Sequence, residues 1–351
     1  MNTTHKLAVP AGGFRRIAVI RLSSLGDVVL TLPVVHALRR AYPEADLQYW
    51  VKEEYAAVLR DDPAVTRVRA LERDASRVED LVSMSAELED RDLIVDLHGS
   101  LRSRLLTFRL PAPVLRLRGS RVQRERWVRA RWTRPRPLPH ATARYAEVLA
   151  PLGLMADGAP HVTVGAAARE WARSQRSALG PGTLVALCPG ARHATKCWPE
   201  ERWCELERGL AKLGVQRVVL STASERRALP KLSAQLTGTS GGVWATEPLD
   251  RSMAWLGECT VAVTHDSGLM HLAAASDRPV VALFGSTSPV LGFSPCGPGH
   301  AVISRELACQ PCTVHGRNAC PLGHFRCMLE IGAEEVLALV RDRLSGQPVA
   351  G

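Results

Sequence analysis

One stretch of the chain, near residue 265, has the residue types and spacing of a site for an anionic group. Residues 261–263 are an apolar run of strand length, a polar turn follows, and residues from Leu269 onward have helical composition. Asp266 or Ser267 can cap this helix, and Gly268 lets another group approach the backbone. Free N–H groups and the positive dipole end would then form a seat for a phosphate or diphosphate. The turn alone favours a capped, buried helix that binds nothing, and only the surrounding loops reverse that preference.

Three further side chains are candidates for chemistry, each with an ordinary alternative. Asp27 falls in the first turn of an expected helix, where a carboxylate stays ionised and can accept a proton from an attacking hydroxyl. Lys196 offers a positive charge to a phosphate leaving group. His271 can donate to an oxyanion. The alternatives are a helix cap for Asp27, a surface position for Lys196 and simple packing for His271.

The elements that must position these side chains alternate between strands and helices. Strands are expected at 16–21, 47–51, 93–97, 184–188, 217–221, 261–263 and 279–284, and helices at 28–41, 145–152, 199–214, 224–236, 249–259 and 334–344. Such alternation predicts parallel sheets with helices on both faces. At 351 residues the chain suits two domains. We therefore expect an α/β protein of two Rossmann-like doubly wound domains facing across a cleft, with boundaries 1–165, 166–330 and a final helix in 331–351.

Four expected loops, 23–27, 189–198, 266–271 and 285–288, fall at the carboxyl ends of strands, where open α/β sheets bind ligands. The chain carries neither G-x-G-x-x-G nor a P-loop lysine motif. A dehydrogenase and an NTPase are therefore disfavoured.

Charge is concentrated in one segment of a chain whose net charge is +10. Between Arg102 and Arg136 there are twelve arginines and one acidic residue, Glu125. A surface with this density of positive charge attracts nucleic acid, anionic lipid or a phosphorylated glycolipid. The alternative is that the arginines form a solvated surface without a partner. Trp127 and Trp132 within the run suit an interfacial segment.

The cysteines provide evidence about the cellular compartment and form a candidate zinc site. Nine cysteines, an odd number, predict reduced thiols and a cytoplasmic location. A group near the C-terminus has the composition of a zinc site, although its second pair is spaced too widely: Cys309, Cys312, His315, Cys320, His324 and Cys327. The alternative is that reduced thiols pack an irregular loop.

Taken in order, these motifs resemble glycosyltransferase family 9, the lipopolysaccharide heptosyltransferases, from Arg16 to about Leu344. The resemblance rests on these segments: Ser23–Asp27 with Thr31–Pro33, Cys188–Ala191 with Lys196–Pro199, Asp266–Ala274, Gly285–Pro289 and Cys309–Cys327. The Pro-Gly-Ala loop and the cysteine-rich tail are most similar to heptosyltransferase II.

The resemblance implies a GT-B type fold whose final helix returns to the N-terminal domain. It implies inverting transfer of heptose from ADP-heptose to the lipopolysaccharide inner core, without metal or cofactor. Residues 1–165 would bind the acceptor and residues 166–330 the nucleotide sugar. By matching position, the resemblance implies that Asp27 is the general base and that Lys196 binds the diphosphate. It places Glu225 near the nucleotide ribose. The implied residues lining the donor site are Asp266, Ser267, Gly268, Leu269 and His271.

The last predictions concern the acceptor and two alternative functions. We expect the basic side chains Arg121, Arg124, Arg126 and Arg129 to meet the anionic glycolipid at the inner-membrane surface, with the protein bound there peripherally. Cys197 follows Lys196 where arginine is common in the family, and residues 191–195 lack paired threonines, which leaves the donor sugar and the rank of the heptose open. One rival is a transferase of the same fold that uses another nucleotide sugar or acceptor glycan. The other, a nucleic-acid-binding protein, leaves the loops of Asp27, Lys196 and Asp266 unexplained, so we expect no nucleic-acid partner.

Overall fold

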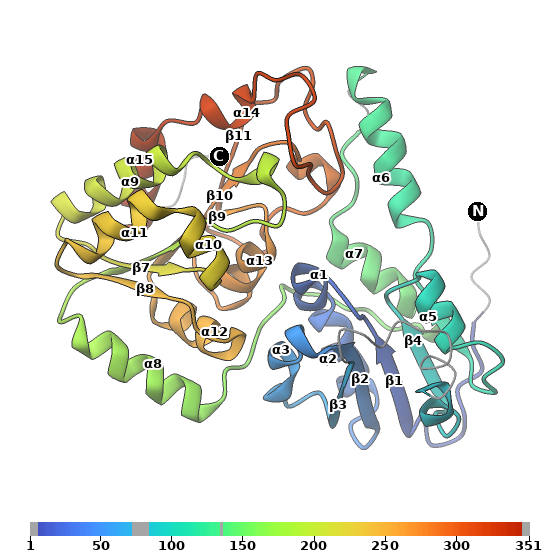
Figure 1. Ribbon diagram of the computed structural model, residues 1–351. Coiled ribbons are helices and arrows are strands. Elements are labelled where there is room, and N and C mark those ends of the chain that lie inside the picture. Colours follow the sequence, from blue (N-terminus) through green and yellow to red (C-terminus); the bar gives the residue numbers. More distant parts are fainter. Residues whose placement is uncertain (1–5, 72–83, 134–135, 346–351) are drawn as a thin grey trace. The chain divides into compact units, whose positions relative to one another are not determined.

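A computed structural model describes residues 6–71, 84–133 and 136–345 of the chain (Figure 1). The chain divides into two compact units. Unit 1 comprises Met1–Ser120 with Pro139–Thr163, and unit 2 comprises Arg121–Leu138 with Val164–Gly351. Each unit is built around its own parallel sheet.

Unit 1 contains a five-stranded sheet in the order β3-β2-β1-β4-β5. All four strand pairings are parallel. Its strands are β1 (Arg16–Ile20), β2 (Asp46–Lys52), β3 (Arg67–Leu71), β4 (Leu93–Asp96) and β5 (Val114–Arg116), and its helices are α1 (Leu25–Leu30), α2 (Leu32–Ala41), α3 (Ala57–Arg60), α5 (Leu101–Leu106) and α7 (Ala141–Ala146). The chain winds outward from β1 in one direction and from β4 in the other, so the topological switch point lies between these two strands.

Unit 2 contains a six-stranded parallel sheet in the order β11-β10-β9-β6-β7-β8, with its switch point between β6 and β9. Its strands are β6 (Leu184–Cys188), β7 (Gln216–Leu220), β8 (Gly242–Ala245), β9 (Val261–His265), β10 (Val280–Phe284) and β11 (Ala301–Ser304). Its helices are α6 (Ser120–Arg129, which begins at the unit boundary), α8 (Ala166–Ala178), α9 (Glu200–Lys212), α10 (Ala223–Ala228), α11 (Pro230–Thr237), α12 (Leu249–Glu258), α13 (Gly268–Ala275), α14 (Arg326–Leu329) and α15 (Ala333–Leu344).

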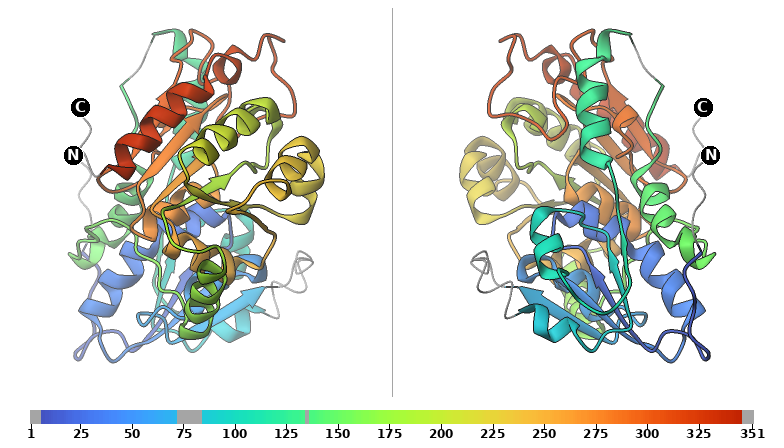
Figure 2. Two further views of the ribbon diagram at one scale, coloured as in Figure 1. Left: turned by 90° about the vertical axis from the view of Figure 1, so that its left-hand side faces the viewer. Right: turned by 90° about the vertical axis from the view of Figure 1, so that its right-hand side faces the viewer.

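Helices cover both faces of the unit 2 sheet. Helix α9 packs against α11 and α15, and α12 packs against α8 and α13 (Figures 1 and 2). The four central strands are buried along their whole length. Burial on both faces explains why β6 and β10 are continuous apolar runs rather than alternating ones.

The predicted α/β architecture of two parallel sheets is confirmed, with local differences. The helix predicted over 28–41 is two helices, α1 and α2, because Pro33 lacks an N–H and starts a new helix after Thr31. The helix predicted over 224–236 likewise divides before Pro230. The strands β3, β5, β8 and β11 were not predicted, since each lies at or next to a sheet edge and is only partly buried.

Two segments lie in a different unit from the one expected. The final helix was expected on the N-terminal domain, but Ile331, Val336 and Val340 are buried in the core of unit 2. The basic segment after Ser120 also belongs to unit 2. There the Arg124 guanidinium donates to the Leu291 carbonyl at 3.1 Å.

Candidate active site

Asp27 lies at the switch point of unit 1, in the first turn of α1 after β1. Both of its carboxylate oxygens have partners. The Tyr145 hydroxyl donates to Oδ1 at 2.6 Å, while Oδ2 lies 2.8 Å from the Arg21 guanidinium and accepts from the Ser24 hydroxyl at 2.8 Å. Arg21 also donates to the Leu97 carbonyl, which follows the adjacent strand β4. Asp27 is therefore held between the loops that follow β1 and β4.

The surroundings keep Asp27 ionised. Burial alone would raise the pKa of this carboxyl, but the Arg21 charge and the hydrogen bonds from Tyr145 and Ser24 outweigh it, so the pKa lies well below its usual range. The side chain remains 17% exposed. A partly accessible carboxylate at a sheet edge that is ionised at physiological pH can accept a proton from a bound hydroxyl or stabilise a neighbouring positive charge.

His98 is a second polar side chain at this edge, directly after Leu97. Burial, together with the Arg21 charge, lowers the pKa of His98 to about 4, so the imidazole is neutral at physiological pH. Its backbone N–H donates to Asp96 Oδ1, whereas its Nδ1 is buried without a hydrogen-bond partner. The sheet edge that holds Asp27 therefore also contains a neutral imidazole with an unused, buried nitrogen.

Lys196 and Asp266 meet at the switch point of unit 2, where the loops after β6 and β9 lie side by side. The Lys196 ammonium lies 2.8 Å from Asp266 Oδ2, and the Thr287 hydroxyl donates to the same oxygen at 2.6 Å. Burial opposes ionisation of Asp266, but Lys196 and Thr287 lower its pKa nonetheless. Three loops predicted to bind ligand, 189–198, 266–271 and 285–288, thus converge on one carboxylate. The resulting site holds one lysine charge, 13% exposed, in a fixed position.

The helix α13 begins beside this pair. Ser267 is its N-cap residue but makes no side-chain capping bond, and its buried hydroxyl has no partner. The N–H groups of Gly268 and Leu269 belong to the first turn, where helical N–H groups have no intrahelical acceptor. His271, by contrast, is buried edge-on against the Phe293 ring. The turn therefore has unused hydrogen-bond donors and the positive end of the helix dipole near Lys196, and both favour the binding of an anionic group.

Glu225 approaches the same edge from β7, the strand next to β6. Its Oε2 caps α10 by accepting from the Thr222 N–H at 2.7 Å and the Thr222 hydroxyl at 2.9 Å. A Cβ placed on Gly190 would stand 2.1 Å from Glu225 Oε1, so only glycine leaves room for this carboxylate over the loop. The cap and the close approach together fix where Glu225 points.

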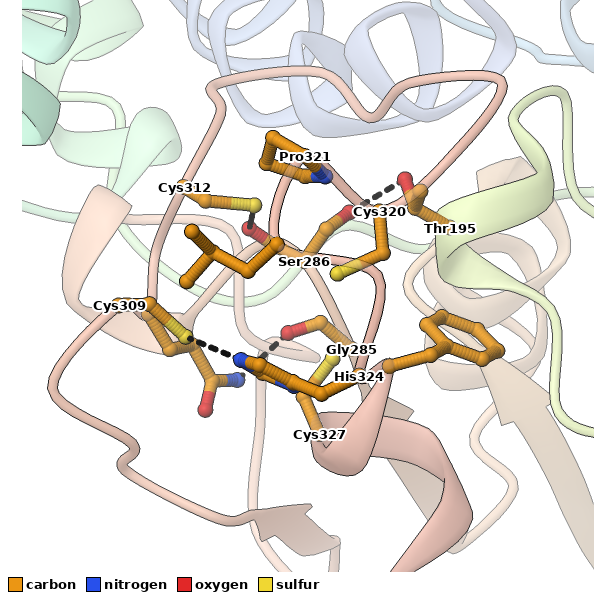
Figure 3. A pocket seen from close by; sticks show the side chains of 12 residues that line it. Thr195, Gly285, Ser286, Cys309, Cys312, Cys320, Pro321, His324 and Cys327 are labelled. Carbon is orange, nitrogen blue, oxygen red and sulfur yellow. Dashed lines mark hydrogen bonds between the residues drawn. The ribbon is translucent and has the colours of Figure 1, made fainter.

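The cysteine-rich tail supports these loops. Thr195 and Arg317 exchange hydrogen bonds at 2.8–3.0 Å, and the Cys312 N–H donates to the Ser286 carbonyl. A pocket here is lined by thiols and an imidazole (Figure 3), together with other residues: Thr195, Gly285, Ser286, Cys309, Gln310, Cys312, Cys320, Pro321, Leu322, His324, Phe325 and Cys327. The tail thus braces the loop that carries Lys196.

The thiols lie close enough to influence one another. Burial, followed by the nearby thiols of Cys312, Cys320 and Cys309, raises the pKa of Cys327 to about 12. Within the described ranges, no group of three or more His, Cys, Asp or Glu side chains could hold a metal ion as placed. All nine cysteines are free thiols.

The four predicted acceptor arginines differ in their surroundings. Arg126 and Arg129 are exposed on α6. Arg124 is 7% exposed, with its guanidinium over the Phe293 ring, so it packs against its own unit rather than facing an open surface. The side chain of Arg121 lies outside the described residues. No helix in the described part of the chain is long and apolar enough to cross a membrane.

The structure adds site residues that sequence reasoning missed. Tyr145 and His98 lie near Asp27, and Thr287 contacts Asp266, only because segments distant in sequence meet at the sheet edges. Arg21 is instead close to Asp27 in sequence and pairs with it across the loop after β1. One signal was present in the sequence, because a charged Arg21 and a His98 each end an apolar strand at an edge where ligands bind.

Comparison with known proteins agrees with this architecture. A solved structure described as E. coli ADP-heptose lps heptosyltransferase II superposes with a TM-score of 0.73 at 23% identity, covering 94% of this chain and 99% of that one. A glycosyltransferase family 9 structure from Veillonella parvula gives a TM-score of 0.79 at 21% identity, covering 95% and 98%. These likenesses show the fold, which is the GT-B type of glycosyltransferases.

Sequence relatives agree as well. The model of glycosyltransferase family 9 (heptosyltransferase) matches residues 81–322. Lipopolysaccharide heptosyltransferase 1 of Pseudomonas aeruginosa is 29% identical over 352 residues, covering 95% of this chain and 96% of the relative. Lipopolysaccharide heptosyltransferase 2 of Salmonella typhimurium is 31% identical over 171 residues, covering 47% and 48%.

Two doubly wound sheets, each with polar groups gathered at its switch point, thus define a glycosyltransferase of the GT-B type. The chain belongs to glycosyltransferase family 9, the heptosyltransferases. Relatives named heptosyltransferase 1 and heptosyltransferase 2 both match, so the particular likeness to heptosyltransferase II stays a prediction.

Proposed function

We propose that this chain transfers heptose from ADP-heptose to the inner core of lipopolysaccharide, with inversion at the anomeric carbon and without a metal ion. The observation that carries the proposal is the Lys196–Asp266–Thr287 cluster beside the unused donors of α13. Its chemistry suits a nucleoside diphosphate, and the names of the relatives supply the sugar and the acceptor class.

On the donor side, the bond between the anomeric carbon and the diphosphate oxygen breaks as negative charge grows on the departing ADP. Lys196 and the N–H groups at the start of α13 stabilise that charge, and Ser267 has a free hydroxyl to donate. Preorganised donors of this kind contribute about 3–4 kcal/mol each to the transition state. Asp266 holds the lysine ammonium in place through their 2.8 Å ion pair.

On the acceptor side, Asp27 receives the proton of the attacking hydroxyl. Because its pKa is low, it is a weak base towards a neutral alcohol. Once the new carbon–oxygen bond begins to form, however, the acceptor oxygen gains positive charge and becomes acidic. The low pKa therefore favours late proton transfer, and attack on the face opposite the leaving ADP inverts the anomeric carbon.

Product analysis over a panel of donors tests the proposal. The enzyme is incubated with truncated core glycolipid and, separately, ADP-heptose, ADP-glucose, UDP-glucose and GDP-mannose, and the glycolipid is analysed by mass spectrometry. We expect one heptose to be added from ADP-heptose and little or no product from the other donors. Transfer of a hexose with no heptose product would instead establish the same fold acting on another nucleotide sugar.

Metal independence has its own test. In this proposal, Lys196 and α13 supply the positive charge that a divalent cation supplies in other transferases. Dialysis against EDTA and phenanthroline should leave turnover unchanged within twofold, an approximate margin for assay scatter. A larger loss that one added metal ion restores would contradict it.

A further inference from the structure

Helix α5 of unit 1 and the turn that follows it expose three large apolar side chains. Leu101 is 74% exposed, Leu105 37% and Phe108 64%. Leu101 and Leu105 lie on one face of α5, since helical neighbours recur at an interval of four residues. Phe108 lies in the turn that follows the helix, where its N–H donates to the Leu105 carbonyl at 3.1 Å. The opposite side of the segment is buried through Ser103 and Leu106. The apolar face is therefore not part of the core of unit 1.

Arginines surround this apolar face. Arg102 is half-buried, and Arg104 and Arg109 are exposed. Within the described part of the chain, none of the three makes an ion pair with a carboxylate. The Arg109 guanidinium lies over the Phe108 ring, 5.2 Å from its centroid. No aspartate or glutamate occurs between Gly99 and Ser120. Exposed leucine and phenylalanine bordered by uncompensated arginine is the chemistry of a segment that lies in an anionic membrane interface.

The position of α5 connects this face to the site. Ser100 caps the helix, and the short segment 97–99 links it to the end of β4. Strand β4 pairs with β1, which leads to Asp27. The helix thus begins at the sheet edge that carries the proposed base, and a lipid-anchored acceptor held by α5 would lie on the same side of unit 1.

We propose that Leu101, Leu105 and Phe108, the α5 face, insert into the interface of an anionic lipid bilayer, with Arg102, Arg104 and Arg109 binding lipid phosphates. The identity of the acceptor as a membrane glycolipid rests on the proposed function, whereas the lipid contact itself does not. Figure 2, right-hand view, shows α5 in teal on the side facing the viewer.

Vesicle binding without any substrate is the first test. Wild type, L101S/F108S and the matched control M155S, which alters a methionine 80% exposed in the same unit, are sedimented with phosphatidylcholine vesicles with and without phosphatidylglycerol. We expect wild type and M155S to bind the anionic vesicles, and L101S/F108S to bind about tenfold or more weakly, because interfacial binding scales with buried apolar area. Equal binding by the double variant, or an equal loss in M155S, overturns the inference.

Two further tests measure the KM for the glycolipid and the oligomeric state of the protein. For L101S/F108S we expect KM to rise for core glycolipid embedded in vesicles, and to stay unchanged for the same acceptor after removal of its acyl chains. If KM rises equally for both, the α5 face binds the sugar and not the bilayer. If ultracentrifugation shows that wild type dimerises and L101S/F108S does not, the face is an interface between copies of this chain. Both results overturn the inference. Failure of the donor panel would leave the vesicle result intact, so the two proposals fail separately.

Discussion

At the scale of single residues, Asp27 depends on its neighbours for its charge. The Tyr145 hydroxyl donates to Oδ1, and a hydrogen bond to the ionised form lowers a carboxyl pKa. Y145F should therefore raise the pKa of Asp27, and the acid limb of kcat/KM should move to higher pH. The control Y42F alters a tyrosine that packs on Phe14, and should leave the profile unchanged. An acid limb that stays in place, or moves lower, would contradict the role of Tyr145.

The same bond affects stability in a definite direction. The folded-state pKa of Asp27 is depressed, so its ionisation stabilises the fold fully above the unfolded value of about 3.9. This stabilisation is lost as pH falls from there through the folded pKa. Y145F should therefore lower the melting temperature at neutral pH more than at strongly acidic pH. A uniform decrease would indicate lost packing alone.

Gly190 gives a second prediction at this scale. G190A would place a methyl carbon against the Glu225 carboxylate, which is anchored to Thr222 by the helix cap. The carboxylate must move, so KM for ADP-heptose should rise while kcat changes little, and loss of the cap should cost about 1 kcal/mol of stability. In the control G257A the new methyl meets open space on α12, and stability should be unchanged or higher by up to about 1 kcal/mol. Unaltered donor KM in G190A would remove Glu225 from the donor site.

At the scale of elements, α6 carries the arginines proposed for the acceptor. Arg126 and Arg129 are exposed, whereas Arg124 is committed to Leu291 and Phe293. R126Q/R129Q should raise KM for the glycolipid at low salt, since each basic residue near an anionic surface contributes about 1 kcal/mol. KM for ADP-heptose should not change. R126K/R129K keeps the charge and should behave as wild type. If the glutamine and lysine variants have the same glycolipid KM, these arginines are only a solvated face.

Strands could be predicted from the sequence where burial on both faces gives a continuous apolar run. Strands β6, β9 and β10 are buried on both faces, so their apolar runs mark them in the sequence. The strands β3 and β5 flank the unit 1 sheet and are only partly buried, so the same signal is missing. Helix α15 shows a different limit. Its sequence predicts an amphipathic helix, but only packing shows that its apolar side belongs with α9.

At the scale of the whole molecule, the sequence predicted which loops matter but not how they meet. Asp27, Lys196 and Asp266 could be chosen because each follows an apolar strand. The contacts of Tyr145 with Asp27, 118 residues apart, and of Thr287 with Asp266 depend on sheet order, which spacing along the chain does not contain. The positions of candidate residues were therefore predictable, and their partners were not.

The central claim is a division of labour, with proton acceptance in unit 1 and leaving-group stabilisation in unit 2. It is tested most directly by measuring ADP affinity by calorimetry and turnover at saturating substrates for D27N and K196A alongside wild type. D27N should lose about 10²–10⁴-fold in kcat, the usual cost of losing a positioned base, while its Kd for ADP matches wild type. K196A should lose both turnover and ADP affinity. A D27N enzyme with at least half of the wild-type kcat (roughly the resolution of such a comparison), or a K196A enzyme with unchanged affinity and turnover, would contradict the account.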